Sequence, residues 1–241
     1  MTGGVTAMKA LIVVAALVAG PASAQTDKAA FDLVLRGIGA GTLSFSGTEE
    51  AGRYAVSGRL QSGGLLGMLR KVRYDAEARG GISGGLPAPL RYRESADTGK
   101  RQSNVEMSWR GGVPRVDAYD PPRDPRPYDV DPATQKGTVD PLTALYAVLR
   151  DVEPGKECRL SLDIFDGRRR TRLALAAPQA KGQGVTCTGE FLRIAGYSRK
   201  DMAEKTRFPF SLTYAPTAEG RMRVVEVATD TLYGRATLTR R

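Results

Sequence analysis

Apolar and polar residues alternate along most of the chain, in short segments that turn residues separate. The apolar positions of the clearest segments are Phe31, Leu33 and Leu35; Tyr54, Val56 and Leu60; Val105, Met107 and Trp109; Leu160, Leu162 and Ile164; and Phe208, Phe210, Leu212 and Tyr214. Because successive side chains of a strand point to opposite faces, this pattern predicts strands with one buried and one solvated face. Many such segments at short spacing are typical of an antiparallel sandwich or barrel.

Two turn signals support antiparallel neighbours. Asp166-Gly167 lies between two alternating segments and is typical of a β-hairpin, and Glu219-Gly220 separates Tyr214 from Val224. The glycine-rich stretch at residues 37–41 runs into another alternating segment, so we interpret it as a hairpin turn and not as a phosphate-binding loop.

The pattern changes to helical spacing at residues 140–150. Asp140 suits a helix N-cap and Pro141 the first helical position, and apolar residues follow at Leu142, Leu145, Tyr146 and Leu149. We expect the leucines to pack against the sheet and the cap to contribute about 0.5–2 kcal/mol. Residues 65–72 predict either a shorter helix or an extension of the following strand.

A proline-rich stretch at residues 120–137 carries charges of both signs and five prolines. Proline lacks a backbone N–H and fixes its φ angle, so this stretch cannot form an ordinary strand or helix. We predict a long loop, either ordered or mobile, within a single domain that covers residues 25–241.

The beginning of the chain resembles a secretory leader. Lys9 precedes the apolar residues 10–19, and Ala22-Ser23-Ala24 follows as a cleavage motif, whether translation starts at Met1 or Met8. We expect export to the periplasm with cleavage after Ala24. The apolar run is shorter than the roughly 20 residues that a spanning helix needs, so no transmembrane segment is predicted.

Cys158 and Cys187 are the two cysteines of the chain. In an oxidising compartment such a pair usually forms a disulfide, which for this loop length would stabilise the fold by about 3–4 kcal/mol. The alternatives are two buried thiols or a redox pair, and the absence of C-x-x-C spacing argues against the second.

Composition narrows the possible chemistry. The 241-residue chain contains no histidine, which removes the Ser-His, Cys-His and His-metal arrangements of many enzymes. Residues 81–85 match G-x-S-x-G, but no base and no following helix support a nucleophile. Carboxylates such as Asp140, Asp163 and Asp166 remain as candidates, although a helix cap and solvent-facing positions explain them better. We expect no enzymatic activity, no cofactor and no metal.

The chain is basic. Loss of Lys9 with the leader lowers the formal net charge from +10 to +9. Arg168, Arg169, Arg170 and Arg172 crowd one predicted hairpin and are candidates for contact with an anionic envelope surface, with an ordinary solvated surface as the alternative. Nucleic acid is not an expected partner outside the cytoplasm.

Five stretches resemble a bacterial periplasmic family known as domain of unknown function 3108. They are AGTLSF at residues 40–45, DPLTALYAVLR at 140–150, CRLSLDIFDGRRR at 158–170, CTGEFLRIAGYS at 187–198 and TDTLYGRATL at 229–238. The resemblance implies an antiparallel, spiral or incompletely closed β-barrel with a helix near its middle, similar to proteins linked to cell-envelope integrity. It implies no activity and no catalytic residue.

Two functions follow as expectations. The first is a non-enzymatic periplasmic protein that supports the envelope by binding another component, whether protein, lipid or cell wall, through its surface or mouth. The alternative is a carrier of a hydrophobic ligand such as a lipid inside the barrel, in an apolar cleft for which the candidate residues are Trp109, Leu145, Phe208, Phe210 and Tyr214. The volume of the interior distinguishes them, because large side chains fill the barrel of a scaffold and a carrier keeps an apolar pocket.

Overall fold

The alternating segments form thirteen strands within the residues that the computed structural model describes, which are 25–64, 67, 71–232 and 234–241. The leader expected at residues 1–24 and most of the segment at 65–72 lie outside the described residues. The strands are β1 (Gln25–Leu35), β2 (Ile38–Glu50), β3 (Arg53–Ser62), β4 (Arg73–Ser83), β5 (Leu86–Asp97), β6 (Gln102–Arg110), β7 (Val113–Asp120), β8 (Ser161–Phe165), β9 (Arg170–Lys181), β10 (Gly184–Ala195), β11 (Arg207–Pro216), β12 (Met222–Thr231) and β13 (Gly234–Arg240).

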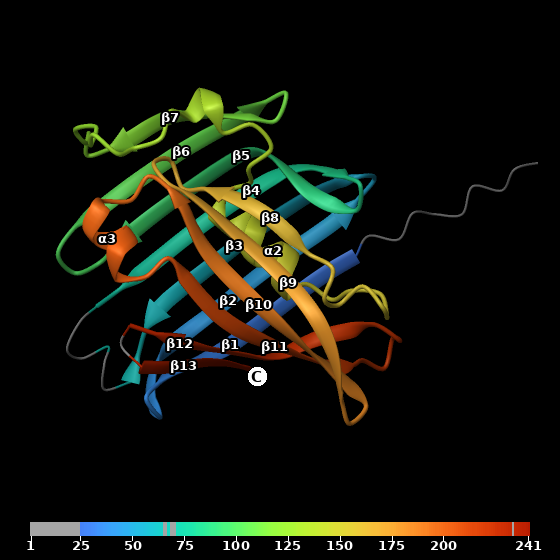
Figure 1. The fold of residues 1–241 in the computed structure, drawn as a ribbon. Helices are drawn as coiled ribbons and strands as arrows, with labels where there is room; N and C mark the ends of the chain where they lie inside the picture. The colour runs from blue at the N-terminus through green and yellow to red at the C-terminus, as the bar shows by residue number, and fades with distance from the viewer. Residues whose placement is uncertain (1–24, 65–66, 68–70, 233) are drawn as a thin grey trace, which may run out of the picture.

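All neighbouring strands of this sheet are antiparallel. The order runs from β7 back through β1 and then from β13 to β8, so the first and last strands pair in the middle of the sheet and β7 and β8 form its edges. The sheet curls into a nearly closed barrel with one unsealed seam between these edges (Figure 1). The predicted mainly β fold, a partly open antiparallel barrel with a central helix, is confirmed.

The proline-rich segment lies along the seam. Gly137 N–H donates to Gly112 O at the β6–β7 turn, at 2.8 Å, and Val139 exchanges backbone hydrogen bonds with Asp163 and Phe165 of β8. The one-turn 3₁₀ helix η1 (Pro132–Thr134) is part of this segment. The loop therefore bridges two edges that do not pair directly, and it supplies hydrogen-bond partners for some of their backbone N–H and C=O groups.

The predicted helix is α2 (Pro141–Leu149), and it lies inside the barrel (Figure 1). The Asp140 carboxylate accepts a hydrogen bond from Thr143 N at 2.8 Å, as expected for the N-cap. Leu142 and Leu149 are buried, while Leu145 is half-buried and faces a cavity described below. A second short helix, α3 (Arg199–Glu204), was not expected from the apolar pattern; Ser198 and Asp201 form its capping box.

Two glycines let α2 approach the sheet closely. A Cβ at Gly47 would lie 2.3 Å from Tyr146 Cε2, and one at Gly58 would lie 2.6 Å from Leu142 Cδ1. The Tyr146 ring is fully buried against Phe45 and Tyr54. Side chains from the two sheet strands and the helix therefore pack closely in this half of the interior.

The other half of the interior is less filled. Helix α2 contacts β3, β4, β5 and β8, and the concave face of β9 to β13 lies across from it. Because barrel diameter grows with strand number, one nine-residue helix cannot occupy the whole lumen of a thirteen-stranded barrel. The remaining space is the cavity described next.

Candidate functional site

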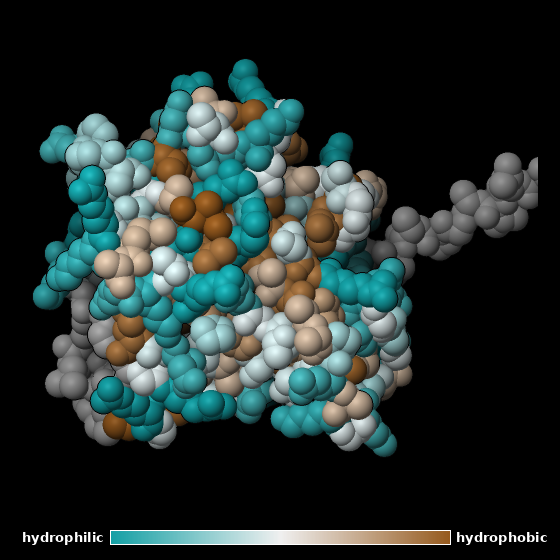
Figure 2. Space-filling model, in the orientation of Figure 1, coloured by the Kyte–Doolittle hydropathy of each residue, from teal (hydrophilic) through white to brown (hydrophobic). Residues whose placement is uncertain are grey.

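An apolar cavity of about 670 Å³ lies between α2 and strands β8 to β13. Helix α2 contributes Leu145 and Val148, and the strands contribute aromatic and aliphatic side chains that face inward. These are Ile164, Leu173, Phe191, Phe208, Phe210, Leu212, Val227 and Leu238, with Leu43 from β2. Phe191, Phe208 and Phe210 are only half-buried, so the cavity is open to solvent. The outer side of β8 to β11 has teal polar residues around small apolar patches (Figure 2).

The charged groups of the cavity gather at one end. Asp166 and Arg169 belong to the β8–β9 turn, and Arg193 and Tyr197 lie near the end of β10, next to α3. In the antiparallel order these segments all lie at the same end of the sheet. The cavity therefore has an apolar body and a cationic end.

The four arginines of the hairpin separate into two groups. Arg168 binds Asp129 at 2.5 Å, Arg172 binds Asp163 at 2.7 Å, and Arg170 also binds Asp163. Arg169 instead lines the cavity, and within the described residues it has no carboxylate within salt-bridge distance. The structure thus leaves one of the four predicted anion contacts without an acidic partner.

Arg193 and Arg169 both pack on Tyr197. Their guanidinium carbons lie 5.0 and 5.1 Å from the centre of the tyrosine ring. Arg193 Nη1 donates to Asp201 O at 2.6 Å and to Lys205 O at 2.8 Å, which fixes its position. Burial, together with the charge of Asp166, raises the pKa of the Tyr197 phenol to about 12 although both arginines oppose the rise. The phenol therefore keeps its proton at neutral pH.

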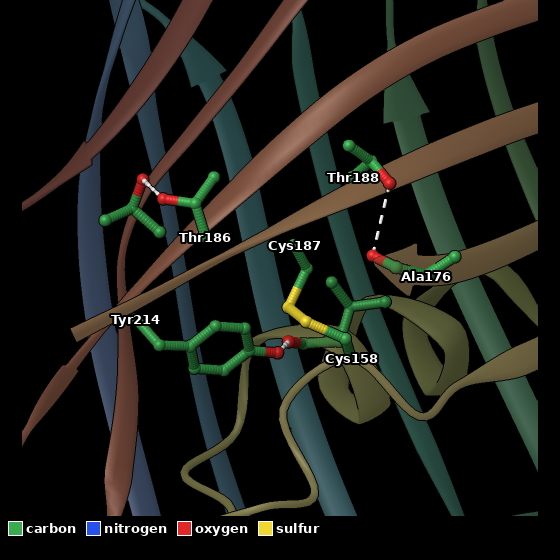
Figure 3. The surroundings of a disulfide bond; sticks show 8 residues. Cys158, Ala176, Thr186, Cys187, Thr188 and Tyr214 are labelled. Atoms are coloured by element: carbon green, nitrogen blue, oxygen red, sulfur yellow. Dashed lines mark hydrogen bonds between the residues drawn. A yellow bond between two sulfur atoms is a disulfide. The ribbon is translucent and has the colours of Figure 1, made fainter. Parts of the chain in front are cut away.

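The five residues predicted for an apolar cleft do not all meet. Leu145, Phe208 and Phe210 line the cavity. Trp109 lies elsewhere in the core, where its indole N–H donates to Thr138 O at 2.9 Å. Tyr214 is buried beside the disulfide, with its hydroxyl 3.4 Å from Val148 O (Figure 3). Alternation alone identifies inward-facing residues, but it does not say which part of the interior they reach.

Cys158 and Cys187 are joined, with Cα atoms 5.4 Å apart (Figure 3). Cys187 lies on β10 at an irregularity in its pairing with β9, between Thr186 and Thr188. Cys158 comes just before the alternating segment that begins at Leu160, and it belongs to the loop between α2 and β8. The bond therefore ties the loop that follows the central helix to the wall of the barrel.

The carboxylates considered for catalysis each have a structural partner. Asp140 caps α2, Asp163 pairs with two arginines, and Asp166 Oδ1 accepts backbone N–H groups of Arg168 and Arg169 in the turn. Ser83 of the G-x-S-x-G match ends β4, and a hairpin leads into β5 rather than into a helix. Within the described residues, His, Cys, Asp and Glu form no cluster of three that could hold a metal ion.

A second group of arginines lies on the outer face of the sheet. Register places Arg79 of β4 directly opposite Arg91 of β5, followed by Ser108 of β6 and Arg115 of β7. Arg79 and Arg91 are exposed and make no ion pair with any described residue. Two residues along the same strands, Arg93 instead lies opposite Glu77 and Glu106. Like charges in direct cross-strand positions are unfavourable, so this row is a candidate anion-binding surface.

Sequence reasoning missed Phe191, Arg193 and Tyr197 as cavity residues. Phe191 and Arg193 alternate along the end of β10 and Tyr197 follows that strand, all in the stretch that contributed to the family resemblance. Alternation at Phe191 and Arg193 was the available signal, but an arginine at an inward position gives no apolar pattern. Its role depends on strands that are distant in the sequence.

Comparison with known proteins agrees with this architecture. The model of the family described as protein of unknown function (DUF3108) matches residues 30–187, which is more than half of the chain. The chain belongs to the DUF3108 family. This DUF3108 domain runs from the middle of β1 to the first residues of β10, so it includes α2 and both cysteines but not α3 or β11 to β13.

A solved structure shares the fold. It is described as a crystal structure of a beta-barrel-like protein of domain of unknown function DUF1849 from Brucella abortus, with a TM-score of 0.50 and 12% sequence identity over 89% of this chain and 94% of that one. At this identity the likeness concerns the fold alone. No curated protein matches the DUF3108 chain. Within the described residues, no helix has the length and apolar character that crossing a membrane requires.

Proposed function

We propose that this DUF3108 protein is a non-enzymatic carrier that binds a hydrophobic ligand in the cavity between α2 and β9 to β13. The sequence favoured a scaffold that binds through its surface, and the volume of the interior is the observation that reverses this preference. A cavity of about 670 Å³ with aromatic and aliphatic walls lies within the range of about 300–1,000 Å³ typical of small-molecule sites. The expected leader supports ligand exchange in the periplasm.

The half-exposed phenylalanines support this proposal. Phe208 and Phe210 of β11 and Phe191 of β10 face the cavity and not the packed half of the core. An apolar ligand that covered them would gain about 25 cal/mol for each Å² removed from water. An acyl chain suits such a site because it is flexible and has no polar groups to leave unsatisfied.

Substitution of Phe210 by arginine tests the carrier function. We expect a fluorescent fatty-acid analogue to bind the wild-type protein, and Phe210→Arg to abolish binding because a charged group would enter the apolar wall. Ile38→Arg is the matched control, since Ile38 is an exposed apolar residue away from the cavity. Circular dichroism verifies the fold of each variant. Val227→Phe, which fills the cavity without adding charge, should also weaken binding.

Two results would contradict the proposal: no binding of the analogue by folded wild-type protein, or binding that Phe210→Arg and Val227→Phe both leave unchanged.

A second measurement uses protein purified from its native cells. We expect denaturing mass spectrometry to show a copurified lipid.

A second candidate function is contact with an anionic lipid surface, and the cross-strand row of Arg79, Arg91 and Arg115 favours it. It corresponds to the envelope binding expected from the sequence, but at a different group of arginines. Each basic residue near an anionic membrane surface contributes about 1 kcal/mol, and this attraction is screened by salt. The two functions are compatible, because a carrier must meet the membrane that supplies its ligand.

Vesicle binding tests the second function. We expect the protein to sediment with phosphatidylglycerol vesicles at low salt but not with neutral vesicles, and Arg79→Gln/Arg91→Gln to weaken binding by about tenfold or more. The control is Arg93→Gln/Arg207→Gln, which removes two exposed arginines that already face glutamates. Equal losses in both double variants would show that only net charge matters and would reject this surface.

A further inference from the structure

We infer that the ligand of the cavity carries one acidic head group, a carboxylate or a phosphate, which binds Arg169 and Arg193 beside Tyr197. This inference rests on the proposed carrier function, because it concerns the polar end of the same cavity. It adds the chemical class of the ligand, an acyl chain with an anionic end, and its orientation in the barrel.

The first observation is that Arg169 has no acceptor. Its Nε is buried and makes no hydrogen bond within the described residues, and no ion pair reaches its Nη atoms. The Nε of Arg170 is also without an acceptor, but another nitrogen of that side chain binds Asp163. A guanidinium is a strong donor of paired hydrogen bonds to carboxylate and phosphate, so leaving it without an acid at a cavity wall is costly unless a ligand supplies one.

The second observation is that neighbouring groups hold the cationic end in place. The backbone carbonyls of Asp201 and Lys205 fix Arg193, and the Tyr197 ring lies within 5.1 Å of both guanidinium carbons. Arg193 also lies 5.0 Å from the centre of the Phe208 ring, which joins this end to the apolar wall. These contacts reduce the conformational entropy that the arginines would lose on binding an anion.

The charge balance at this end favours an anion. Asp166 is the acidic side chain among the cavity residues, and its Oδ1 already accepts two backbone N–H groups of the turn. Lys205 lies near the rim, with Nζ 4.9 Å from the centre of the Phe208 ring. The Asp201 carboxylate is also near: its pKa is lowered chiefly by the hydrogen bond from Ser198 in the capping box, and in smaller part by Arg193 and Arg169. Two arginines and a nearby lysine therefore outnumber two carboxylates that are already engaged.

The apolar wall determines the orientation of the ligand. From the cationic end, the cavity continues past Phe208 and Phe210 towards Leu43 and Leu238, with no further charged side chain among its lining residues. A head group at Arg169 thus places the acyl chain along α2. The opposite orientation would leave both the arginines and the acid unpaired.

The experiment compares three ligands of equal chain length: a fatty acid, the corresponding alkyl phosphate and the primary alcohol. Each displaces a fluorescent probe from wild-type protein and from Arg169→Gln, at a pH where both acids are ionised. We expect the better acidic ligand to bind about tenfold or more tightly than the alcohol, and Arg169→Gln to remove most of this preference. Which acid binds more tightly identifies the head group as carboxylate or phosphate.

Two controls keep the result interpretable. Arg172→Gln removes a charge from the same arginine run, but its side chain binds Asp163 rather than the cavity, so it should leave the preference unchanged. Arg169→Lys keeps the charge without the paired donors and should retain part of the preference. Unfolding midpoints confirm that each variant is folded.

The outcomes separate this inference from the proposed function. If acid and alcohol bind equally, or if Arg169→Gln and Arg172→Gln act alike, the acidic head group is wrong while the apolar carrier stands. If none of the three ligands binds folded wild-type protein, the carrier function itself is wrong.

Discussion

Complete burial raises the pKa of the Asp140 carboxyl to about 6, although hydrogen bonds from Thr143 oppose the rise. Asp140 Oδ2 accepts from the Thr143 hydroxyl, which also lies 2.6 Å from the Tyr54 hydroxyl. The same carboxyl caps α2. At the scale of single residues, the position of a side chain in the barrel thus decides both its charge and its role.

The pH dependence of stability follows from this shift. Asp140 has an ordinary pKa of 3.8 in the unfolded chain, so between about pH 4 and pH 6 the folded state binds the extra proton. Its contribution to the free energy of unfolding therefore falls as pH rises through this window, by about 3 kcal/mol at most. We expect Asp140→Asn, which keeps a capping oxygen, to remove this loss.

Urea unfolding of wild-type and Asp140→Asn protein at pH 4, 5, 6 and 7 measures the effect. The free energy of unfolding of the variant, relative to that of wild-type protein, should rise from pH 4 to pH 6 and then remain constant. A difference that does not change with pH would contradict the burial argument. Asp140→Ala also removes the cap, so its free energy of unfolding should be lower than that of Asp140→Asn by about 0.5–2 kcal/mol.

At the scale of elements, glycine positions on β2 and β3 determine how deeply α2 sits. Gly47 faces the ring of Tyr146 and Gly58 faces Leu142. The helix covers one half of the concave face, and the disulfide anchors the loop that follows it to β10. The location of the cavity is therefore a consequence of where the helix is held.

A methyl group at Gly47 should displace the helix. Gly47→Ala places Cβ 2.3 Å from Tyr146 Cε2, and Phe45 and Tyr54 prevent the ring from moving away. We expect a loss of about 1–3 kcal/mol in the free energy of unfolding, as for other overpacked cores. The control is Gly81→Ala in β4, where the nearest atom would be 3.7 Å away and the expected change is small or stabilising. Equal denaturation midpoints for the two variants would reject this role of Gly47.

At the scale of the whole molecule, the barrel has two separate surfaces with basic character. One is the end of the inner cavity at Arg169 and Arg193, and the other is the outer row that includes Arg79 and Arg91. The proline-rich loop bridges the seam between β7 and β8, so a thirteen-stranded sheet encloses a lumen without full closure. These features together support a carrier that also contacts an anionic surface.

The sequence by itself determined the strands with the clearest alternation, among them β1, β3, β6, β8 and β11, together with the central helix and the hairpin at Asp166. Each of these depends on local side-chain periodicity, capping and turn residues. The family resemblance, rather than periodicity, indicated a partly open barrel instead of a sandwich. The disulfide was predictable because the chain has only two cysteines and its beginning resembles a secretory leader.

Only the tertiary structure decided which inward residues share the cavity. Trp109 and Phe210 alternate in the same way, yet Trp109 lies in the filled part of the core and Phe210 lines the cavity. Likewise, the four arginines of residues 168–172 lie together in the sequence, but Asp129 and Asp163 pair with three of them and leave Arg169 without a described acidic partner. The physical reason is that periodicity gives the face of a strand, whereas volume and charge pairing depend on distant segments that meet only when the sheet curls.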